Sequence, residues 1–339
     1  MQKPKLILIL IALVGFIGIS FYTWNLISTK KEDPSVISNA VADAKPVDKG
    51  FHWTAPDTNS IANDENGQLV NYGRQLIANT SYYLGPKGTV AAISNGMNCQ
   101  NCHLQAGTKT WGNNYGGVFS TYPKHRDRSG GIETIHKRVN DCIQRSLNGK
   151  TELDSNSKEM KAIYAYMQWL GQEVPMKVKP VGSSIEDIKF LSRAADPKNG
   201  ERLFAIKCQT CHGPEGKGLS NNDGSGFIYP PLWGEKSYTT AAGLYRLSRL
   251  AGYIKNNMPN GSSHESPMLT DEEAWDIAAF VNSQQRPVKK FKQDWPDISK
   301  KPYDHPFGPY TDGFTEEQHK YGPFEPIIEK RKELSKTNK

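Results

Sequence analysis

Apolar residues recur with helical spacing in the segments that flank two short cysteine-containing sequences. The first segment begins near Val70, and a second runs over residues 158–174. Residues 199–204 resemble residues 71–76 in order, so we expect a third helix there. A fourth begins at Thr270, where Thr-Asp-Glu-Glu forms a capping-box sequence. The apolar positions of these helices are Val70, Tyr72, Leu76, Ile77, Met160, Ile163, Tyr164, Met167, Trp169, Leu170, Leu203, Phe204, Trp275, Ile277, Phe280 and Val281.

Between the helices of each pair lies the sequence Cys-x-x-Cys-His, at residues 99–103 and again at residues 208–212. This spacing is the attachment signature of a c-type haem, in which both thiols bond to the porphyrin and the histidine binds the iron. A single copy would also suit a zinc site or a redox-active cysteine pair, but two copies favour haem. We predict two covalently bound haems, with Cys99, Cys102, Cys208 and Cys211 as attachment residues and His103 and His212 as proximal iron ligands.

The chain thus repeats one plan: a helix, the haem sequence, loops, and a terminal helix that a proline follows, at Pro175 and at Pro287. This plan resembles the all-α cytochrome c fold used twice in tandem. We place an N-terminal cytochrome c domain at residues 61–180 and a C-terminal cytochrome c domain at residues 185–286.

The chain continues beyond the second predicted domain. Residues 287–327 are rich in proline but also in aromatic residues, which disordered tails usually lack. We therefore expect this extension to pack on the folded body as irregular structure. The last segment, residues 328–339, is strongly charged and is predicted to fray.

The N-terminus has the form of an export signal. Lys3 and Lys5 precede an apolar run over residues 6–22, which is near the lower length limit for crossing a bilayer. No small-residue cleavage site closes this run, which favours an uncleaved anchor within residues 1–28 over a removed signal peptide. The polar residues 29–60 are predicted to be a tether. Both interpretations place the body of the protein in the periplasm, tethered to the inner membrane if the apolar run is retained.

The net charge and the cysteine content limit the possible partners and functions of the protein. The net charge of +7 on 339 residues is modest and no long basic block occurs, so we expect no nucleic-acid partner. Five cysteines minus two haem pairs leave Cys142 unassigned. An odd cysteine in an exported protein suggests a reactive thiol or an intermolecular bond, although a buried core cysteine is the commoner case.

A helix predicted over residues 132–147 would place Cys142 between Arg138 and Arg145 on one face, and Asn148-Gly149 would stop it. Neighbouring guanidinium groups favour the thiolate form of a cysteine, and a thiolate is both a nucleophile and an iron ligand. The apolar positions of this helix would be Ile132, Ile135, Val139 and Ile143.

The second ligand of a haem iron determines whether the haem only transfers electrons or also catalyses a reaction. In the second domain Met258, followed by a proline before the terminal helix, is the favoured ligand, and Met268 is the alternative. Either methionine could instead fill the core. In the first domain no methionine occupies the equivalent region, where His125, His136 and Cys142 lie.

Together these residues resemble the family of two-haem thiosulfate dehydrogenases, some members of which work mainly as tetrathionate reductases. The resemblance extends over about residues 50–327, and the lone cysteine after the first haem sequence is a specific feature of it. Residues 295–310 resemble the bifunctional, reductase-leaning branch. The other matching segments are residues 119–123, 128–130, 142–149, 255–259 and 267–275, together with Arg138.

The resemblance implies a ligand pair for each iron, a set of substrate-holding side chains, and two side chains that modulate the second haem. The implied iron ligands are His103 and Cys142 for the first, catalytic haem, and His212 and Met258 for the second. The implied substrate-holding residues are Arg128 and Arg138, with Arg145 and Ser146 as possible further contacts, and the modulators are Lys255 and Asn257.

The implied reaction joins two thiosulfates into tetrathionate and releases two electrons, or runs in reverse. Cys142 would form a covalent S-thiosulfonate with one thiosulfate, which a second thiosulfate then attacks. The second haem would pass the electrons to a periplasmic cytochrome c or another redox partner. Three alternatives remain open: a plain two-haem electron carrier, a sulfur-oxidation subunit that acts on a carrier protein, and a two-haem peroxidase.

Overall fold

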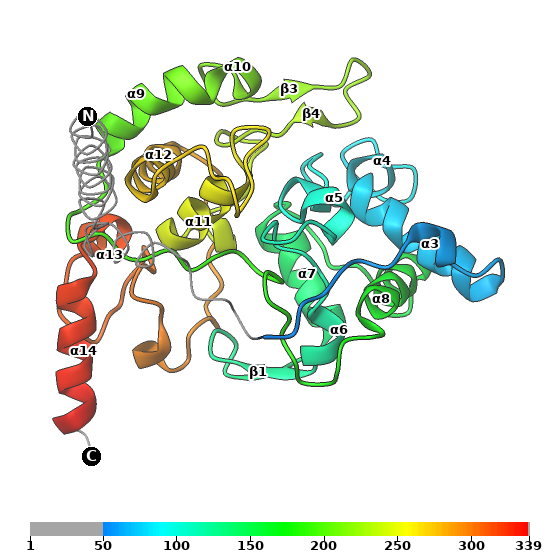
Figure 1. The fold of residues 1–339 in the computed structure, drawn as a ribbon, viewed down its shortest axis with the longest axis horizontal. Helices are drawn as coiled ribbons and strands as arrows, with labels where there is room; N and C mark the ends of the chain where they lie inside the picture. Colours follow the sequence, from blue (N-terminus) through cyan, green and yellow to red (C-terminus); the bar gives the residue numbers. More distant parts are fainter. Residues whose placement is uncertain (1–49, 338–339) are drawn as a thin grey trace, which may run out of the picture. The chain divides into compact units, whose positions relative to one another are not determined.

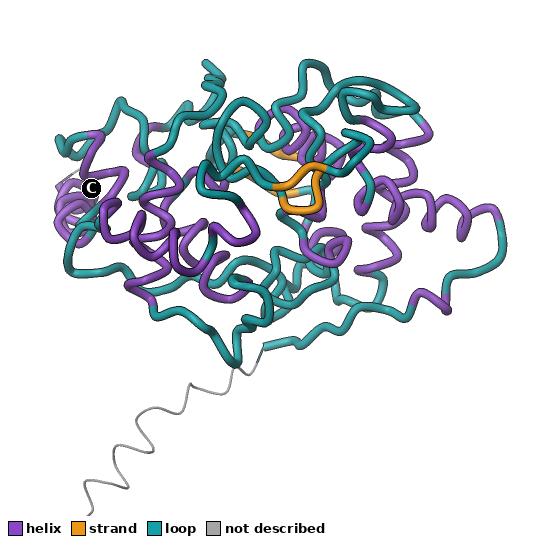
Figure 2. The backbone as a smooth tube through the Cα atoms, turned by 90° about the horizontal axis from the view of Figure 1, so that it is seen from above, coloured by secondary structure: helices purple, strands orange, loops and turns teal. Residues whose placement is uncertain are grey.

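The computed structural model describes residues 50–337, where the regular secondary structure is mostly helical and long loops connect the helices (Figure 1, Figure 2). The strands form two short antiparallel pairs, β1 (Lys124–Arg126) with β2 (Gly131–Glu133) and β3 (Leu219–Ser220) with β4 (Phe227–Tyr229). The 3-10 helices are η1 (Thr58–Ser60), η2 (Cys99–Asn101), η3 (Gly243–Tyr245) and η4 (Ile298–Lys300). The α-helices are α3 (Glu65–Ala78), α4 (Thr80–Leu84), α5 (Leu104–Gly107), α6 (Val118–Thr121), α7 (Ile135–Arg145), α8 (Lys158–Gly171), α9 (Pro197–Lys207), α10 (Gln209–His212), α11 (Leu247–Asn257), α12 (Asp271–Ser283), α13 (Glu316–Tyr321) and α14 (Glu325–Thr337).

The predicted export segment, residues 6–22, lies outside the described residues. Among residues 50–337, no helix is both long and apolar enough to cross a bilayer. The last eleven residues of the predicted tether, 50–60, belong to the described structure, and Trp53 among them is attached to the first domain. The indole nitrogen of Trp53 donates a hydrogen bond to the carbonyl oxygen of Leu170 (3.0 Å), and the indole ring packs on Gly116.

The first domain is framed by α3 and α8, which cross at Gly73. A methyl group on Gly73 would lie 2.0 Å from the carbonyl oxygen of Ala162, so this approach requires glycine. Side chains cap the start of both helices, Asp64 for α3 and Ser157 for α8. The buried apolar residues of the two helices are Val70, Leu76, Ile77, Met160, Ile163, Tyr166, Met167 and Leu170.

The second domain repeats this frame with α9 and α12. A methyl group on Gly200 would lie 1.9 Å from the carbonyl oxygen of Asp276. Thr270 and Glu273 form the predicted capping box at the start of α12. The residue order shared by residues 71–76 and 199–204 therefore marks the same helix crossing in two all-α domains.

The two domains have separate apolar cores that a third, smaller cluster joins. The hydroxyl of Tyr253 in the second domain also donates a hydrogen bond to the carbonyl oxygen of Asn101 in the first haem sequence (2.8 Å). The core contacts therefore extend across both domains. The third cluster consists of Met97, Leu147, Tyr238, Ala242 and Tyr245.

Helix α7 begins at Ile135, three residues later than predicted. Ile132 lies on β2 and is 67 % exposed, so it does not belong to the apolar face of the helix. The reason is local: residues 131–133 pair with β1, and the Thr134 side chain then caps the helix by accepting from the Lys137 amide. Asn148, with a φ of 49°, follows the end of α7 at the predicted stop.

The C-terminal extension contains more helix than predicted. Residues 301–315 form no helix, but α13 and α14 follow them, and α14 continues to Thr337. The prediction of a frayed tail over residues 328–339 is thus wrong within the described residues. Two contacts hold this charged helix: Ile327 is fully buried against the second core, and Nε of Arg331 lies 2.6 Å from Oδ2 of Asp312.

Replacing Gly73 by alanine is expected to lower the free energy of unfolding by about 1–3 kcal/mol, because the methyl group overpacks the crossing of α3 and α8. The midpoint of chemical unfolding of the purified holoprotein measures the change. Gly131→Ala is the matched control, since nothing lies within 4 Å of a methyl group there. Equal midpoints for the two variants would contradict close packing at Gly73.

Candidate functional site

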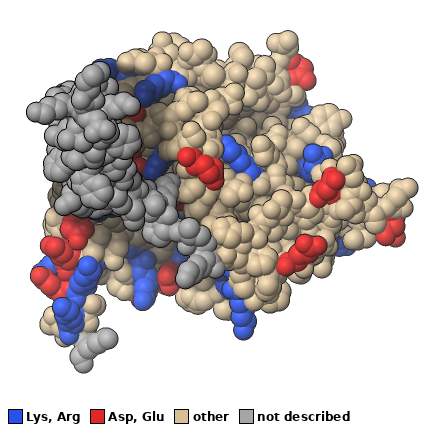
Figure 3. Space-filling model, viewed as in Figure 1, with Lys and Arg blue, Asp and Glu red and all other residues tan. Residues whose placement is uncertain are grey.

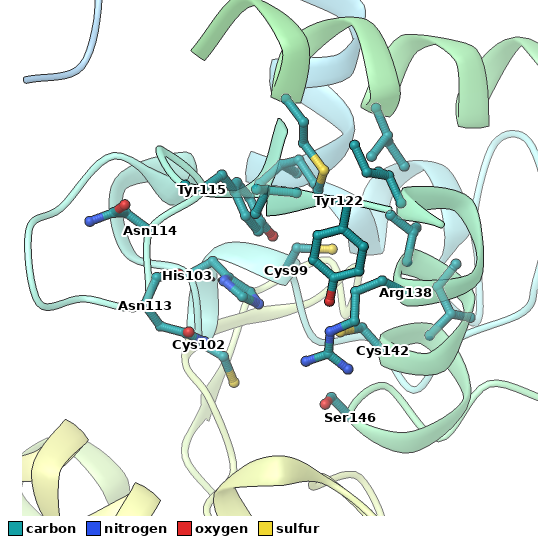
Figure 4. Close-up of a pocket in the computed structure, with 18 of the residues that line it drawn as sticks. Cys99, Cys102, His103, Asn113, Asn114, Tyr115, Tyr122, Arg138, Cys142 and Ser146 are labelled. Carbon is teal, nitrogen blue, oxygen red and sulfur yellow. Dashed lines mark hydrogen bonds between the residues drawn. The ribbon is translucent and has the colours of Figure 1, made fainter. Parts of the chain in front are cut away.

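A cavity of about 300 Å³ lies in the first domain between the first haem sequence and helix α7. Three residues of the haem sequence face it from one side, and three residues of α7 and its end face it from the other (Figure 4). The structure thereby places Cys142 on the same cavity as the first haem sequence. The facing residues are Cys99, Cys102 and His103, and Arg138, Cys142 and Ser146; apolar lining comes from Leu76, Ile77, Val139, Ile143, Ile163 and Met167.

His103 is held in the form that an iron ligand needs. Its Nδ1 lies 2.5 Å from the carbonyl oxygen of Asn113, which can only accept, so Nδ1 carries the proton and Nε2 keeps a free lone pair. Burial lowers the pKa of His103 to about 4, which keeps the ring neutral at physiological pH. The ring of Tyr115 stacks on it, with centroids 4.4 Å apart.

The two cysteines of the first haem sequence are buried thiols. Burial raises the pKa of Cys99 to about 11 and that of Cys102 to about 12, so both are protonated near neutral pH. The amide of Cys99 donates to Oγ1 of Thr80 (2.9 Å), just beyond the end of α3. The first helix of the domain therefore positions the thiol pair.

Arg138 lies one turn before Cys142 on α7, and Ser146 lies one turn after it. The electrostatic interaction with Cys142 raises the pKa of the Arg138 guanidinium, and this effect outweighs burial, which lowers it. In Figure 4 the hydroxyl of Tyr122 points toward Arg138. The site thus places a sulfur atom, a fixed positive charge and hydroxyl groups along one wall of the cavity.

Further cations line the same cavity: Lys124, Arg126 and Lys179. Burial lowers the pKa of Lys124, and the charges of Arg126 and Arg138 lower it further. The opposing carboxylate is Glu133, whose Oε2 lies 3.8 Å from Nε of Arg126. On the face shown in Figure 3 basic and acidic side chains are interspersed, whereas the cavity gathers cations and so favours anions.

Arg128 and Arg145, two predicted substrate contacts, do not line this cavity and are bound by carboxylates instead. Nη2 of Arg128 lies 2.6 Å from Oδ2 of Asp141. Arg145 makes a two-pronged pair with Asp294, at 2.6 and 2.7 Å, and its Nε lies 3.4 Å from Asp141. The prediction that Arg145 flanks the Cys142 thiol is therefore wrong, because a carboxylate distant in sequence draws the guanidinium away from the cavity.

The second haem sequence repeats the histidine arrangement. Nδ1 of His212 lies 3.1 Å from the carbonyl oxygen of Pro230, which again leaves Nε2 without a proton. Burial lowers the pKa of His212 and raises that of Cys208 to about 11. Both domains thus present a neutral imidazole beside a pair of cysteines.

The predicted distal region of the second domain lies at the end of α11. Met258 follows this helix directly and is half-buried against the second core, which Cys208 also contacts. Met268, the alternative ligand, is 54 % exposed. Within the last turn of α11, Nζ of Lys255 lies 2.6 Å from Oδ1 of Asp271, and the side-chain Nδ2 of Asn257 donates to the carbonyl oxygen of Trp111 (3.2 Å).

The residues present fit a c-type haem in each domain. Each haem sequence offers two thiols that belong to no disulfide and an imidazole with its coordinating nitrogen unprotonated. A backbone carbonyl fixes the ring in both cases, as is usual for a metal-bound histidine. In the first domain an apolar wall completes the cavity.

The sequence did not single out Tyr115, Tyr122 or Lys179 as site residues. Tyr122 belongs to residues 119–123, a segment that carries the family resemblance, so a signal for it was present. Lys179 lies in a proline-rich linker and has no local signal, because only the tertiary structure brings it to the cavity.

Two family models match the chain, one in each domain. The model described as the SoxA/TsdA cytochrome c domain matches residues 89–176, and the model described as subunit III of cbb3-type cytochrome c oxidase matches residues 195–281. The fold is therefore the all-α cytochrome c fold, and c-type haem is the cofactor.

Relatives over most of the chain share one name. Thiosulfate dehydrogenase of Psychrobacter arcticus is 41 % identical over 244 residues, which are 71 % of this chain and 71 % of that protein. Thiosulfate dehydrogenase of Allochromatium vinosum is 34 % identical over 239 residues, 69 % of this chain and 84 % of that protein. The solved structure of thiosulfate dehydrogenase TsdBA from Marichromatium purpuratum, in its as-isolated form, superimposes on this chain with a TM-score of 0.65 at 26 % sequence identity. The superposition covers 74 % of this chain and about half (52 %) of the TsdBA chain. This chain belongs to the thiosulfate dehydrogenase family.

Proposed function

We propose that this protein interconverts thiosulfate and tetrathionate in both directions, with Cys142 as the reacting sulfur. The observation that carries the proposal is the shared cavity, in which Cys142 and Arg138 face the first haem sequence. The name of the relatives supports thiosulfate as the substrate. The cations that line the cavity suit a small anion of this kind.

In the oxidative direction, the Cys142 thiolate and the outer sulfur of one thiosulfate form an S–S bond with the loss of two electrons. The outer sulfur of a second thiosulfate then attacks the sulfur that bears the sulfonate in this adduct. The bond to Cys142 breaks, tetrathionate leaves, and the thiolate is restored. When bound, the haems accept these electrons one at a time. The reverse reaction consumes two electrons and releases two thiosulfates.

Two dianions must come together in this reaction, and their repulsion has to be offset. Each pair of unit charges 4 Å apart repels by about 4 kcal/mol at an effective dielectric constant of about 20. Arg138 can present two parallel N–H donors to a sulfonate, and Ser146 can add a hydroxyl donor. Arg128 keeps N–H donors that its ion pair with Asp141 does not use, since the pair engages only Nη2 and Nε has no partner among the described residues.

We assign the second domain to electron relay, toward a periplasmic cytochrome c or another redox partner. The proposed location is the periplasm, with residues 6–22 as the signal or membrane anchor. The proposed iron ligands are His103 and Cys142 for the first haem and His212 and Met258 for the second, attached through Cys99, Cys102, Cys208 and Cys211, with Lys255 and Asn257 modulating the second haem.

Cys142→Ala is expected to lower turnover in both directions by about a thousandfold or more, because the reacting sulfur is removed. The assays are thiosulfate with an artificial electron acceptor, and tetrathionate with a reduced viologen, on the purified holoprotein. Haem content of the variant should equal that of the wild type. Near-normal turnover in Cys142→Ala would exclude the mechanism, and a wild-type protein inactive in both assays would exclude the proposed function.

Lys179→Gln is expected to raise the KM for thiosulfate by about threefold at low ionic strength, because a positive charge at the cavity is lost. The difference should shrink as salt approaches about 0.15 M, where charges are screened beyond roughly 8 Å. Lys177→Gln is the control, since Lys177 is exposed two residues away and does not line the cavity. Equal KM values for the two variants would contradict a role for cavity charge.

A further inference from the structure

The first ten residues of the C-terminal extension, 287–296, run along the end of α7 that carries Cys142; we call this segment the strap. The amide of Thr240 in the second domain donates to the carbonyl oxygen of Pro287 (3.0 Å), and the amide of Lys289 donates to Oγ1 of Thr240 (3.1 Å). The strap is therefore anchored on the second domain before it reaches the first.

The strap binds the C-terminal end of α7 through Lys289. Its Nζ donates to the carbonyl oxygens of Gln144 (3.0 Å) and Gly149 (2.6 Å). The last carbonyl groups of a helix lack partners within the helix and carry partial negative charge, so a partly buried ammonium group stabilises them. Lys289 thus fixes the turn that follows Cys142.

The strap also binds the side chain of Arg145, which is 4 % exposed. Asp294 accepts two parallel hydrogen bonds from its guanidinium, at 2.6 and 2.7 Å, and the ring of Phe291 stacks on it at 3.8 Å. Two-pronged pairs of this kind restrict orientation as well as distance. Because Arg145 lies three residues after Cys142, this pair restricts the rotation of the last turn of α7.

A second part of the site is held by the same segment. The amide of Trp295 donates to the carbonyl oxygen of Arg128 (2.7 Å), and Pro296 packs against Gly130. Asp141 accepts from both Arg128 and Arg145. Asp141 therefore joins the two arginines through direct hydrogen bonds, at 2.6 Å to Arg128 and 3.4 Å to Arg145.

We propose that the strap positions both the Cys142 end of α7 and Arg128 for the reaction, with Asp294 as the main positioning residue. Asp294 acts through Arg145 and Asp141 and touches no reacting atom. The inference rests on the proposed function, because it assigns Cys142 and Arg128 to the reaction. It adds a role for residues of the extension, which lie about 150 positions after the helix that they hold.

Loss of the Asp294 charge has a specific expected consequence. Asp141 is then the only carboxylate that pairs with the buried Arg145. The stronger pull of Arg145 on Asp141 weakens the ion pair between Asp141 and Arg128. Arg128 and the last turn of α7 both shift. We therefore expect a higher KM for thiosulfate and tetrathionate and a changed environment of the Cys142 sulfur.

The test compares Asp294→Asn with Asp304→Asn in the full-length holoenzyme. Asp304 is the matched control because it lies in the same extension, is 1 % exposed, and also makes an ion pair, but with Arg246 of the second domain (2.8 Å). It also accepts a hydrogen bond from the hydroxyl of Ser248 (2.6 Å). The measurements are KM and kcat in both directions, the unfolding temperature, and the absorption and electron paramagnetic resonance spectra that report sulfur ligation of the first haem.

We expect both variants to unfold at a lower temperature, but only Asp294→Asn to raise KM, by about fivefold or more, and to change the spectrum. Asp294→Glu should restore part of the loss. Wild-type KM and spectra in Asp294→Asn, or equal changes in Asp304→Asn, would overturn the proposal. The spectra test the positioning role of Asp294 even if the wild type turns over neither substrate. Failure of this proposal can therefore be told apart from failure of the proposed function.

A second pair of variants applies if Asp294→Asn does not fold. Lys289→Met removes the two hydrogen bonds to the end of α7, and Lys290→Met, at its exposed neighbour, is the control. Lys289→Met should raise KM and change the spectrum while Lys290→Met should not. Equal behaviour of the two lysine variants would likewise overturn the proposal.

Discussion

In each domain two helices cross with their backbones in contact, and one glycine makes this close approach possible. The haem sequences are attached to the frame that these crossings form. In the first domain α3 crosses α8 at Gly73, and Thr80, two residues beyond α3, binds the amide of Cys99. In the second domain α9 crosses α12 at Gly200 and runs directly into Cys208. The position of each thiol pair relative to its core therefore follows from a helix crossing and not from the five-residue haem sequence alone.

In the first domain this frame must also accommodate several buried positive charges near the cavity. Ionised groups lose hydration when they are buried, so each cation near the cavity needs a partner or an anionic ligand. The structure divides them into two groups: Arg128 and Arg145 are bound by Asp141 and Asp294, whereas Arg138 faces the cavity beside Cys142. This division concentrates positive charge where a dianion would bind and neutralises it elsewhere.

Features with local signals could be predicted from the sequence, and features that depend on distant partners could not. The haem sequences, the capping box at Thr270 and the end of α7 near Asn148 each depend on a few neighbouring residues. Helical spacing placed Arg138 and Cys142 together correctly, but it gave Arg145 the wrong environment because Asp294 is 149 residues away. For the same reason the charged tail was predicted to fray, although Ile327 and Arg331 anchor it.

The two proposed distal ligands, Met258 and Cys142, differ in what each requires of the protein around it. A methionine thioether is neutral, so Met258 needs only a half-buried place at the end of α11. A cysteine that reacts as a thiolate carries charge and needs a cation such as Arg138 held close to it. That cation must be kept apart from other cations, which in turn need carboxylates. In the proposed mechanism, the ion pairs around α7 and the extension that supplies Asp294 thus follow from the requirements of a reacting sulfur in the first domain.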